Sequence, residues 1–164
     1  MVDAEPLRPL AVIDIDGVLA DVGHRLHFLS RRPKDWKGFF TAARSDPPHP
    51  KGLALVAELA ADHEVVLLTG RPEECRADTE AWLAECGIRY ELLVMRPAGN
   101  RRPAAEVKVA LLATLARGRT IGAVVDDDTE VVAAVQAAGY PVRLAVWGRP
   151  SEALHRAQEV EGRT

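Results

Sequence analysis

The acidic pair Asp14 and Asp16 ends an apolar, strand-like run near the beginning of the chain, in the stretch AVIDIDGVL at residues 11–19. A buried strand tolerates few charges, so two carboxylates at its carboxyl end require an explanation. In open α/β sheets, ligands bind just outside the carboxyl ends of the strands. Carboxylates in such a place can act as nucleophiles, as proton carriers or as ligands of a hard cation. This pair is therefore the first candidate for a functional site.

Polar residues also follow two further strand-like runs. The run at 65–68 is followed by Thr69-Gly70-Arg71, and the run at 121–125 is followed by Asp126-Asp127. Lys108 lies in the helical pattern that precedes the second of these runs. Each feature alone has a structural explanation, since acidic residues cap helices and solvate strand ends. Three such strand ends at one edge of a sheet, together with a lysine, indicate a functional site.

Strand-like and helix-like runs alternate along the chain. We expect strands at 10–15, 65–68, 92–95, 121–125 and 142–146. We expect helices at 51–61, 72–86, 104–116, 129–138 and 151–159. Strands that alternate with helices of this length form βαβ units with right-handed crossovers. The sequence therefore predicts one α/β domain over residues 1–164, with a central parallel sheet of about five strands and helices on both faces.

The composition is that of an ordinary globular protein. Of the 164 residues, 48% are hydrophobic and 27% are charged, and the formal net charge is −3. This charge provides no overall attraction to nucleic acid or to an anionic membrane, although local basic patches remain possible. No apolar run approaches the roughly 18 residues needed to cross a bilayer. The beginning of the chain carries Asp3 and Glu5 and no apolar signal segment, so we expect a cytoplasmic location.

The order of the polar features resembles the motif order of the haloacid dehalogenase (HAD) superfamily. The four motifs correspond to Asp14-x-Asp16-Gly17-Val18, Thr69-Gly70-Arg71, Lys108 and Asp126-Asp127. The resemblance spans about residues 10–147 and implies a Rossmannoid three-layer sandwich with a short flap, or minimal cap, after the first strand. A second acid at the position of Asp16 is typical of the superfamily's phosphatases, whereas its dehalogenases lack that acid. The resemblance therefore implies a phosphatase.

The resemblance also implies a role for each catalytic residue. Asp14 is the nucleophile that attacks phosphorus and forms an aspartyl-phosphate. Asp16 is the general acid that protonates the leaving oxygen, and later the base that activates water. Thr69 and the backbone amides near Gly70 hold the phosphoryl oxygens, and Lys108 neutralises charge on the phosphate and on the nucleophile.

A carboxylate nucleophile and a phosphate repel each other. Two unit charges about 4 Å apart interact by about 4 kcal/mol at an effective dielectric of about 20, and a phosphate dianion roughly doubles this value. A divalent cation offsets the repulsion, and oxygen ligands favour Mg²⁺. The resemblance implies that Mg²⁺ is held by the Asp14 carboxylate, the Asp16 backbone carbonyl and an acid of the pair Asp126-Asp127.

The flap, at about residues 18–50, is where substrate preference should arise. It contains all three phenylalanines of the chain together with Trp36 and several cations, among them Arg31, Arg32, Lys34 and Lys37. Cations interleaved with aromatic residues can hold a phosphate backbone and stack bases. The alternative is that the aromatic residues form a small core under the flap while the cations are solvated. A second basic run, with Arg96, Arg101 and Arg102, follows the third strand.

Within the superfamily, the chain most resembles the 3′-phosphatase domain of phage-type polynucleotide kinase-phosphatases. The resemblance involves Arg25, Arg71 and Arg102, and it implies that these arginines bind the phosphorylated substrate. Arg25 stands eleven residues after the nucleophile, where that family has a functional arginine. One departure is Ala104, because the phage member has an aspartate four residues before the lysine. The chain carries no P-loop motif of a kinase.

Three functions remain open at this point. The first is a Mg²⁺-dependent phosphomonoesterase that acts on a nucleic-acid 3′-phosphate or a nucleotide. The second is the same catalyst acting on a small non-nucleotide metabolite, since a short flap leaves the site open. The third is a non-catalytic module that uses the fold for protein contacts, which the complete set of catalytic residue types disfavours. The sequence predicts a phosphorylated substrate and no membrane partner, and it leaves the oligomeric state undetermined.

Overall fold

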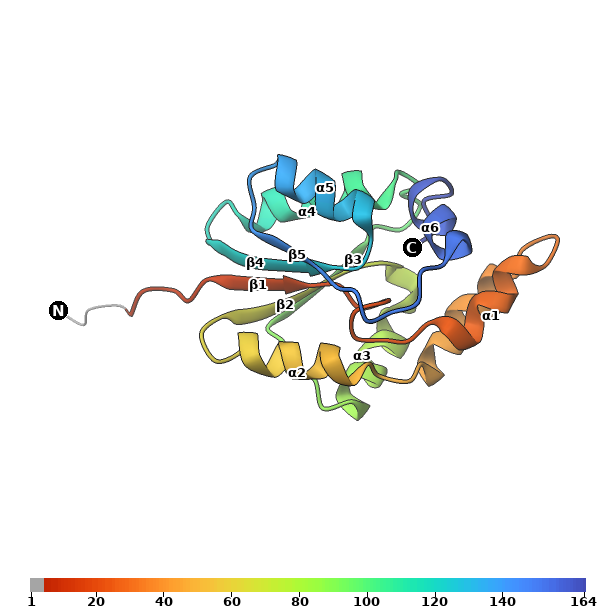
Figure 1. The fold of residues 1–164 in the computed structure, drawn as a ribbon, viewed down its shortest axis with the longest axis horizontal. Coiled ribbons are helices and arrows are strands. Elements are labelled where there is room, and N and C mark those ends of the chain that lie inside the picture. The colour runs from red at the N-terminus through yellow and green to blue at the C-terminus, as the bar shows by residue number, and fades with distance from the viewer. Residues whose placement is uncertain (1–4) are drawn as a thin grey trace.

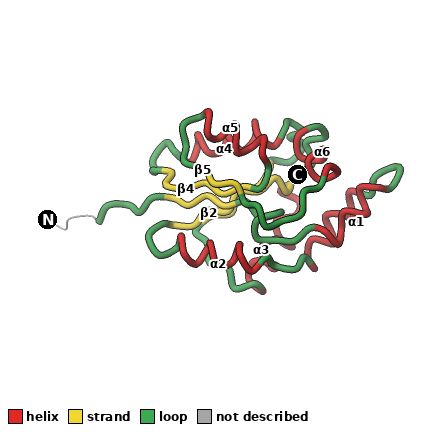
Figure 2. Tube along the Cα trace, in the orientation of Figure 1, coloured by secondary structure: helices red, strands yellow, loops and turns green. Residues whose placement is uncertain are grey.

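The computed structural model describes residues 5–164 and contains one five-stranded parallel sheet (Figures 1 and 2). The strands are β1 (Leu10–Ile13), β2 (Glu64–Pro72), β3 (Leu92–Arg96), β4 (Ile121–Asp126) and β5 (Val142–Leu144). Their order across the sheet is β3-β2-β1-β4-β5, and every neighbouring pair is parallel. The predicted α/β architecture is confirmed. Since β1 is central, the residues that follow it lie in the middle of the carboxyl edge of the sheet.

Helices cover both faces of the sheet, as Figure 1 shows. The α-helices are α1 (Trp36–Ala42), α2 (Pro50–Leu59), α3 (Arg76–Glu85), α4 (Ala104–Leu115), α5 (Thr129–Ala137) and α6 (Glu152–Glu159). Helices α2 and α3 lie on one face, and α4 and α5 lie on the other. Helices α1 and α6 lie beyond the carboxyl edge of the strands, on the side where a ligand can reach the strand ends.

The central strand β1 is buried on both faces, because its side chains alternate between two cores. Ala11 and Ile13 pack in the core beneath α2 and α3, and Leu10 and Val12 pack in the core beneath α4 and α5. A strand that is covered in this way is held rigidly by both helical layers. The acidic residues that follow β1 are therefore attached to one of the most firmly packed parts of the molecule.

The flap forms a third, smaller core with α6. It contains the 3₁₀ segment η1 (Gly23–Ser30), helix α1 and the short 3₁₀ segment η2 (Ala43–Ser45). Phe39 is completely buried there with Leu154 and Ala157 of α6, and the other flap aromatic residues pack against this cluster. The structure thus shows the small-core alternative for these aromatic side chains. Their rings contact one another and the arginines of the flap.

Three element boundaries differ from the predicted ones. The β1 ladder ends at Ile13, so that both acids lie beyond the strand, and β5 ends at Leu144. The predicted helix at 72–86 is wrong at its start, because β2 continues to Pro72 and α3 begins only at Arg76. Pro72 pairs with Arg96 of β3, so the long-range pairing outweighs the local preference of proline for the first turn of a helix.

Among residues 5–164, none of the helices combines the length and the apolar character needed to cross a bilayer.

Candidate active site

Three elements bring Asp14, Lys108 and Asp126 into direct contact. Asp14 follows β1, Asp126 ends β4, and Lys108 lies on the inward face of α4. The Lys108 ammonium group is 3.0 Å from Asp14 Oδ1 and 2.6 Å from Asp126 Oδ2. All three side chains are at most 5% exposed. Because water is almost excluded, these charges interact much more strongly than they would on the surface.

Burial and charge together perturb the ionisation of this group. Burial raises the pKa of Asp14 well above its ordinary value, the neighbouring Asp126 raises it further, and Lys108 opposes both effects. The two carboxylates also raise the pKa of Lys108 despite its burial, so the lysine remains protonated. One ammonium group does not compensate several buried carboxylates, and the site therefore favours additional positive charge.

The acidic residues offer a site for a divalent cation. Asp14, Asp126 and Asp127 each contribute a carboxylate oxygen, and these three oxygens lie within 4.8 Å of one another. Asp14 Oδ2 and Asp127 Oδ1 are buried and have no hydrogen-bond partner within the described part of the chain. Burial raises the pKa of Asp127 to about 7, and the charge of Asp126 contributes further. Convergent, unpartnered carboxylate oxygens fit Mg²⁺, which prefers hard oxygen ligands.

Gly17 is required by the position of Asp127. Its backbone has a φ of +82°, a conformation that side chains rarely adopt. A Cβ atom added at Gly17 would also lie 1.9 Å from Asp127 Oδ2. The glycine of the first motif therefore gives the Asp127 carboxylate room to approach the loop after β1.

Asp16 is held apart from the carboxylate cluster by two buried arginines. Its Oδ1 accepts hydrogen bonds from Nη2 of Arg71 at 2.6 Å and from Nη2 of Arg25 at 2.9 Å. Burial by itself would raise the pKa of Asp16, but the charges of Arg71 and Arg25 lower it to about 2. Asp16 is thus a carboxylate in this arrangement, whereas the Oδ2 atom has no partner within residues 5–164.

Asp46 completes this network, although the sequence offered no signal for it. Its carboxylate accepts two hydrogen bonds from Arg25, at 2.8 and 2.9 Å, and one from Arg71 at 3.2 Å. Trp82 of α3 donates its indole N–H to the Asp46 backbone carbonyl at 2.8 Å. The two arginines and two aspartates are all nearly inaccessible to solvent, and their formal charges sum to zero. Asp46 stands before Pro47 in a loop, where no periodicity marks a residue as buried.

The structure separates the predicted arginines into different roles. Arg25 and Arg71 are completely buried, and their donors are engaged by Asp16 and Asp46, so they orient Asp16. Arg102 is exposed and pairs with Glu106 on the first turn of α4 at 2.9 Å. The structure therefore does not bring Arg102 into the cluster of catalytic side chains, because its own carboxylate partner lies one helical turn away.

The loop after the core of β2 has the form expected of a phosphate-binding loop. Thr69 is 1% exposed, and its hydroxyl oxygen accepts a hydrogen bond from the backbone N–H of Arg71 at 3.1 Å. Gly70 lies against the backbone of Thr164, so close that an added Cβ atom would be 2.2 Å from the Thr164 carbonyl carbon. Thr69 and Gly70 thus lie next to Asp14 at the carboxyl edge of the sheet, as adjacent strands require.

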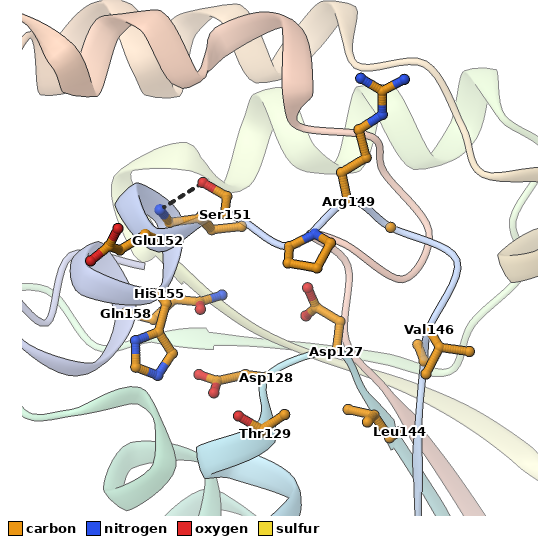
Figure 3. Close-up of a pocket in the computed structure, with 14 residues that line it drawn as sticks. Asp127, Asp128, Thr129, Leu144, Val146, Arg149, Ser151, Glu152, His155 and Gln158 are labelled. Atoms are coloured by element: carbon orange, nitrogen blue, oxygen red, sulfur yellow. Dashed lines mark hydrogen bonds between the residues drawn. The ribbon is translucent and has the colours of Figure 1, made fainter.

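A cavity of about 430 Å³ opens beside the metal-competent acids (Figure 3). Asp127 and Asp128, from the loop between β4 and α5, line one side of it. His155 and Gln158 of α6 line the opposite side, and Leu144 at the end of β5 forms part of the apolar wall. This cavity is large enough for a small ligand and adjoins the site through Asp127.

The fold and the site together define a class of protein. A parallel α/β sheet that carries acids after β1 and β4, a threonine after β2 and a lysine on the preceding helix is the HAD phosphatase arrangement. Residues 9–146 match the family described as the polynucleotide kinase PNKP phosphatase domain. Since this match covers most of the chain, the protein belongs to that family and is a hydrolase.

Solved structures show the same fold. A chain of the Pnkp1/Rnl/Hen1 complex has a TM-score of 0.74 at 23% identity, over 90% of this chain and 49% of that one. A HAD-like hydrolase from Streptococcus pneumoniae has a TM-score of 0.62 at 13% identity, over 92% of this chain and 90% of that one. A HAD-family enzyme from Bacteroides thetaiotaomicron, in complex with magnesium and inorganic phosphate, has a TM-score of 0.56 at 14% identity, over 92% of this chain and all of that one.

The present chain spans about half the length of the Pnkp1 complex chains that it matches, with coverage of 49% and 44% in the two structures. No curated protein sequence matches it significantly.

Proposed function

We propose that this protein is a Mg²⁺-dependent phosphomonoesterase that works through an aspartyl-phosphate on a nucleic-acid 3′-phosphate or a nucleotide. The observation that carries the proposal is the position of Asp14. Its Oδ1 contacts Lys108 at 3.0 Å, while its Oδ2 is buried and unpartnered near the oxygens of Asp126 and Asp127. A purely structural ion pair would leave no such buried oxygen without a partner.

The first step transfers the phosphoryl group to the protein. A carboxylate oxygen of Asp14 forms a bond to phosphorus, the ester P–O bond breaks, and the leaving oxygen takes a proton from Asp16. Thr69 and the backbone amides after it bind the phosphoryl oxygens, and Lys108 offsets their charge. When bound, Mg²⁺ would supply the further positive charge that reduces repulsion between the phosphate and Asp14.

The second step releases phosphate. Asp16 takes a proton from water, the water oxygen attacks phosphorus, and the bond between phosphorus and Asp14 breaks. The ion pairs with Arg25 and Arg71 keep Asp16 charged and suit this role of base. For its earlier role as an acid, Asp16 has to gain a proton as the leaving group arrives and to give up part of its contact with the arginines.

The substrate class is supported by the family and by the best-matching assembly. The family is described by a polynucleotide kinase, and one matching chain belongs to the Pnkp1/Rnl/Hen1 RNA repair complex. A substrate at the end of a nucleic-acid strand would be consistent with both. The cytoplasmic location expected from the sequence remains a prediction.

Phosphate release from p-nitrophenyl phosphate, with and without Mg²⁺, tests the chemistry. We expect Mg²⁺-dependent turnover that Asp14→Asn reduces to below a few per cent of the original rate. Asp62→Asn is the matched control, because its exposed carboxylate precedes β2 at the opposite edge of the sheet and should have no effect. Turnover that survives Asp14→Asn would show that another group is the nucleophile.

A comparison of phosphorylated substrates tests the substrate class. We expect faster hydrolysis, at equal concentration, of 3′-phosphorylated oligonucleotides or mononucleotides than of sugar phosphates. A preference for sugar phosphates would favour a small-metabolite phosphatase instead. A folded protein that binds Mg²⁺ but hydrolyses none of these compounds would support a non-catalytic role.

A further inference from the structure

Three separate segments meet beside the phosphate-binding loop, and Arg96 joins them. Its guanidinium group is fully buried and donates hydrogen bonds to the carbonyl oxygens of Gly70, Arg102 and Thr164, at 3.1, 2.7 and 3.1 Å. Arg96 therefore fixes the loop after β3 and the segment at 160–164 next to Gly70. Figure 1 shows this last segment beside α6, at the carboxyl edge of the sheet.

The segment at 160–164 brings Arg163 close to Arg101 and to the flap. Gly162 has a φ of +59°, and an added Cβ atom would lie 1.9 Å from the Arg101 carbonyl oxygen. The Arg163 guanidinium carbon is 4.9 Å from the centroid of the Trp36 ring. Trp36 thus holds Arg163 by a cation–π contact, which limits the freedom of this long side chain.

The resulting surface carries positive charge that its neighbours do not neutralise. Within the described residues, neither Arg101 nor Arg163 forms an ion pair, whereas Glu161 pairs with Lys34 at 2.5 Å. Burial is the main reason that the pKa of Arg96 falls to about 10, and the charge of Arg101 lowers it further. The pKa of Arg163 is lowered by the same two causes in the same order. Like charges that a fold holds close together attract an anion with several charges.

We propose that Arg101 and Arg163 form a docking surface for the phosphate backbone of the strand whose terminal phosphate is hydrolysed. The proposal rests on the proposed function, since it takes the Thr69–Gly70 loop as the place of the terminal phosphate. Arg96 bonds to the Gly70 carbonyl, so the surface begins directly beside that loop. Trp36 supports Arg163 and is already covered by it, so the contact is with phosphates and is independent of base sequence.

Alanine variants of the two arginines test the docking surface, with a short 3′-phosphorylated oligonucleotide and p-nitrophenyl phosphate as the two substrates. Each lost phosphate contact on a single strand should reduce the slope of log KM against log salt by about 0.7, equivalent to about a five-fold higher KM in about 0.1 M salt. We therefore expect about a 25-fold higher oligonucleotide KM for Arg101→Ala/Arg163→Ala. The KM for p-nitrophenyl phosphate should change much less.

Arg117→Ala is the matched control. It removes the same charge from an exposed position between α4 and β4, at the opposite edge of the sheet, and should leave both KM values unchanged. Fluorescence anisotropy with the labelled oligonucleotide measures binding separately from turnover. An unchanged oligonucleotide affinity and salt slope in the double variant would overturn the docking surface, even in a fully active phosphatase. Loss of p-nitrophenyl phosphate turnover in the unaltered protein would instead refute the proposed function, while anisotropy would still test the surface.

Discussion

Replacing Asp46 by asparagine removes one of two negative charges from a buried network that also contains two arginines. In the intact protein, Arg25 and Arg71 are balanced by Asp16 and Asp46, and all four side chains are at most 3% exposed. The Asp46→Asn variant keeps the size of the side chain but leaves one buried positive charge without compensation. We expect a large loss of stability, because charge is costly in a medium that cannot solvate it.

The magnitude follows from the geometry. Arg25 contacts Asp46 through two short hydrogen bonds of 2.8 and 2.9 Å, and neither side chain reaches solvent. Removing one partner of such a buried pair costs about 3–5 kcal/mol. For a chain of this size, each kcal/mol lowers the melting temperature by about 2–4 °C. The Asp46→Asn variant should therefore melt roughly 6–20 °C below the original protein.

Equilibrium denaturation in urea, followed by circular dichroism, measures the change in the free energy of unfolding. The informative comparison is a cycle of Asp46→Asn, Arg25→Gln and the double variant. The double variant again contains one positive and one negative charge, Arg71 and Asp16, so its loss should be smaller than the sum of the single losses by about 1–3 kcal/mol. Glu106→Gln is the control, because its exposed pair with Arg102 should contribute less than about 1 kcal/mol. Additive losses in the cycle would refute the charge-balance argument.

Two other predictions concern the metal-competent acids. The folded-state pKa of Asp127 is about 7, above its unfolded value, so between about pH 4 and pH 7 the folded protein binds more protons than the unfolded chain. The metal-free protein should therefore become more stable as the pH falls from 8 to 5, and Mg²⁺ should raise the melting temperature more at pH 8 than at pH 6, where protons compete for the carboxylate; a pH-independent Mg²⁺ effect in thermal melts would contradict this. Gly17→Ala should abolish the Mg²⁺-induced rise in melting temperature, since the added Cβ atom overlaps Asp127 Oδ2. Gly139→Ala is the matched control, because its φ of +90° imposes similar backbone strain in open space, and it should lose about 1–3 kcal/mol of stability while keeping the Mg²⁺ response.

The catalytic set could be recognised from the sequence because its members follow strands of one parallel sheet. Apolar runs identify the strands, and parallel strands present their carboxyl ends at the same edge. This reasoning is enough to expect that Asp14, Thr69 and Asp126 lie close together. Their actual contacts with Lys108 required the structure, because the rotation of α4 against the sheet depends on packing.

The flap shows where inference from the sequence stops. Its interleaved cations and aromatic residues were compatible both with a nucleic-acid surface and with a small core, and the packing of Phe39 against α6 shows the core. Arg25 and Arg102 were assigned the same role, yet one is buried against Asp46 and the other pairs on the surface with Glu106. Local sequence cannot distinguish them, because each fate depends on a carboxylate brought in by the chain fold or by the helix.

The sequence by itself thus determined the α/β fold, the family and the set of acids, lysine and threonine at the strand ends. These features depend on local hydrophobic periodicity and on the position of a residue relative to its own strand. Only the tertiary structure showed that Asp46 balances two buried arginines, that Asp16 is held as a carboxylate, and that Arg101 and Arg163 meet beside Gly70. Such contacts join residues far apart in the chain, and long-range packing together with the exclusion of water decides which charges come together.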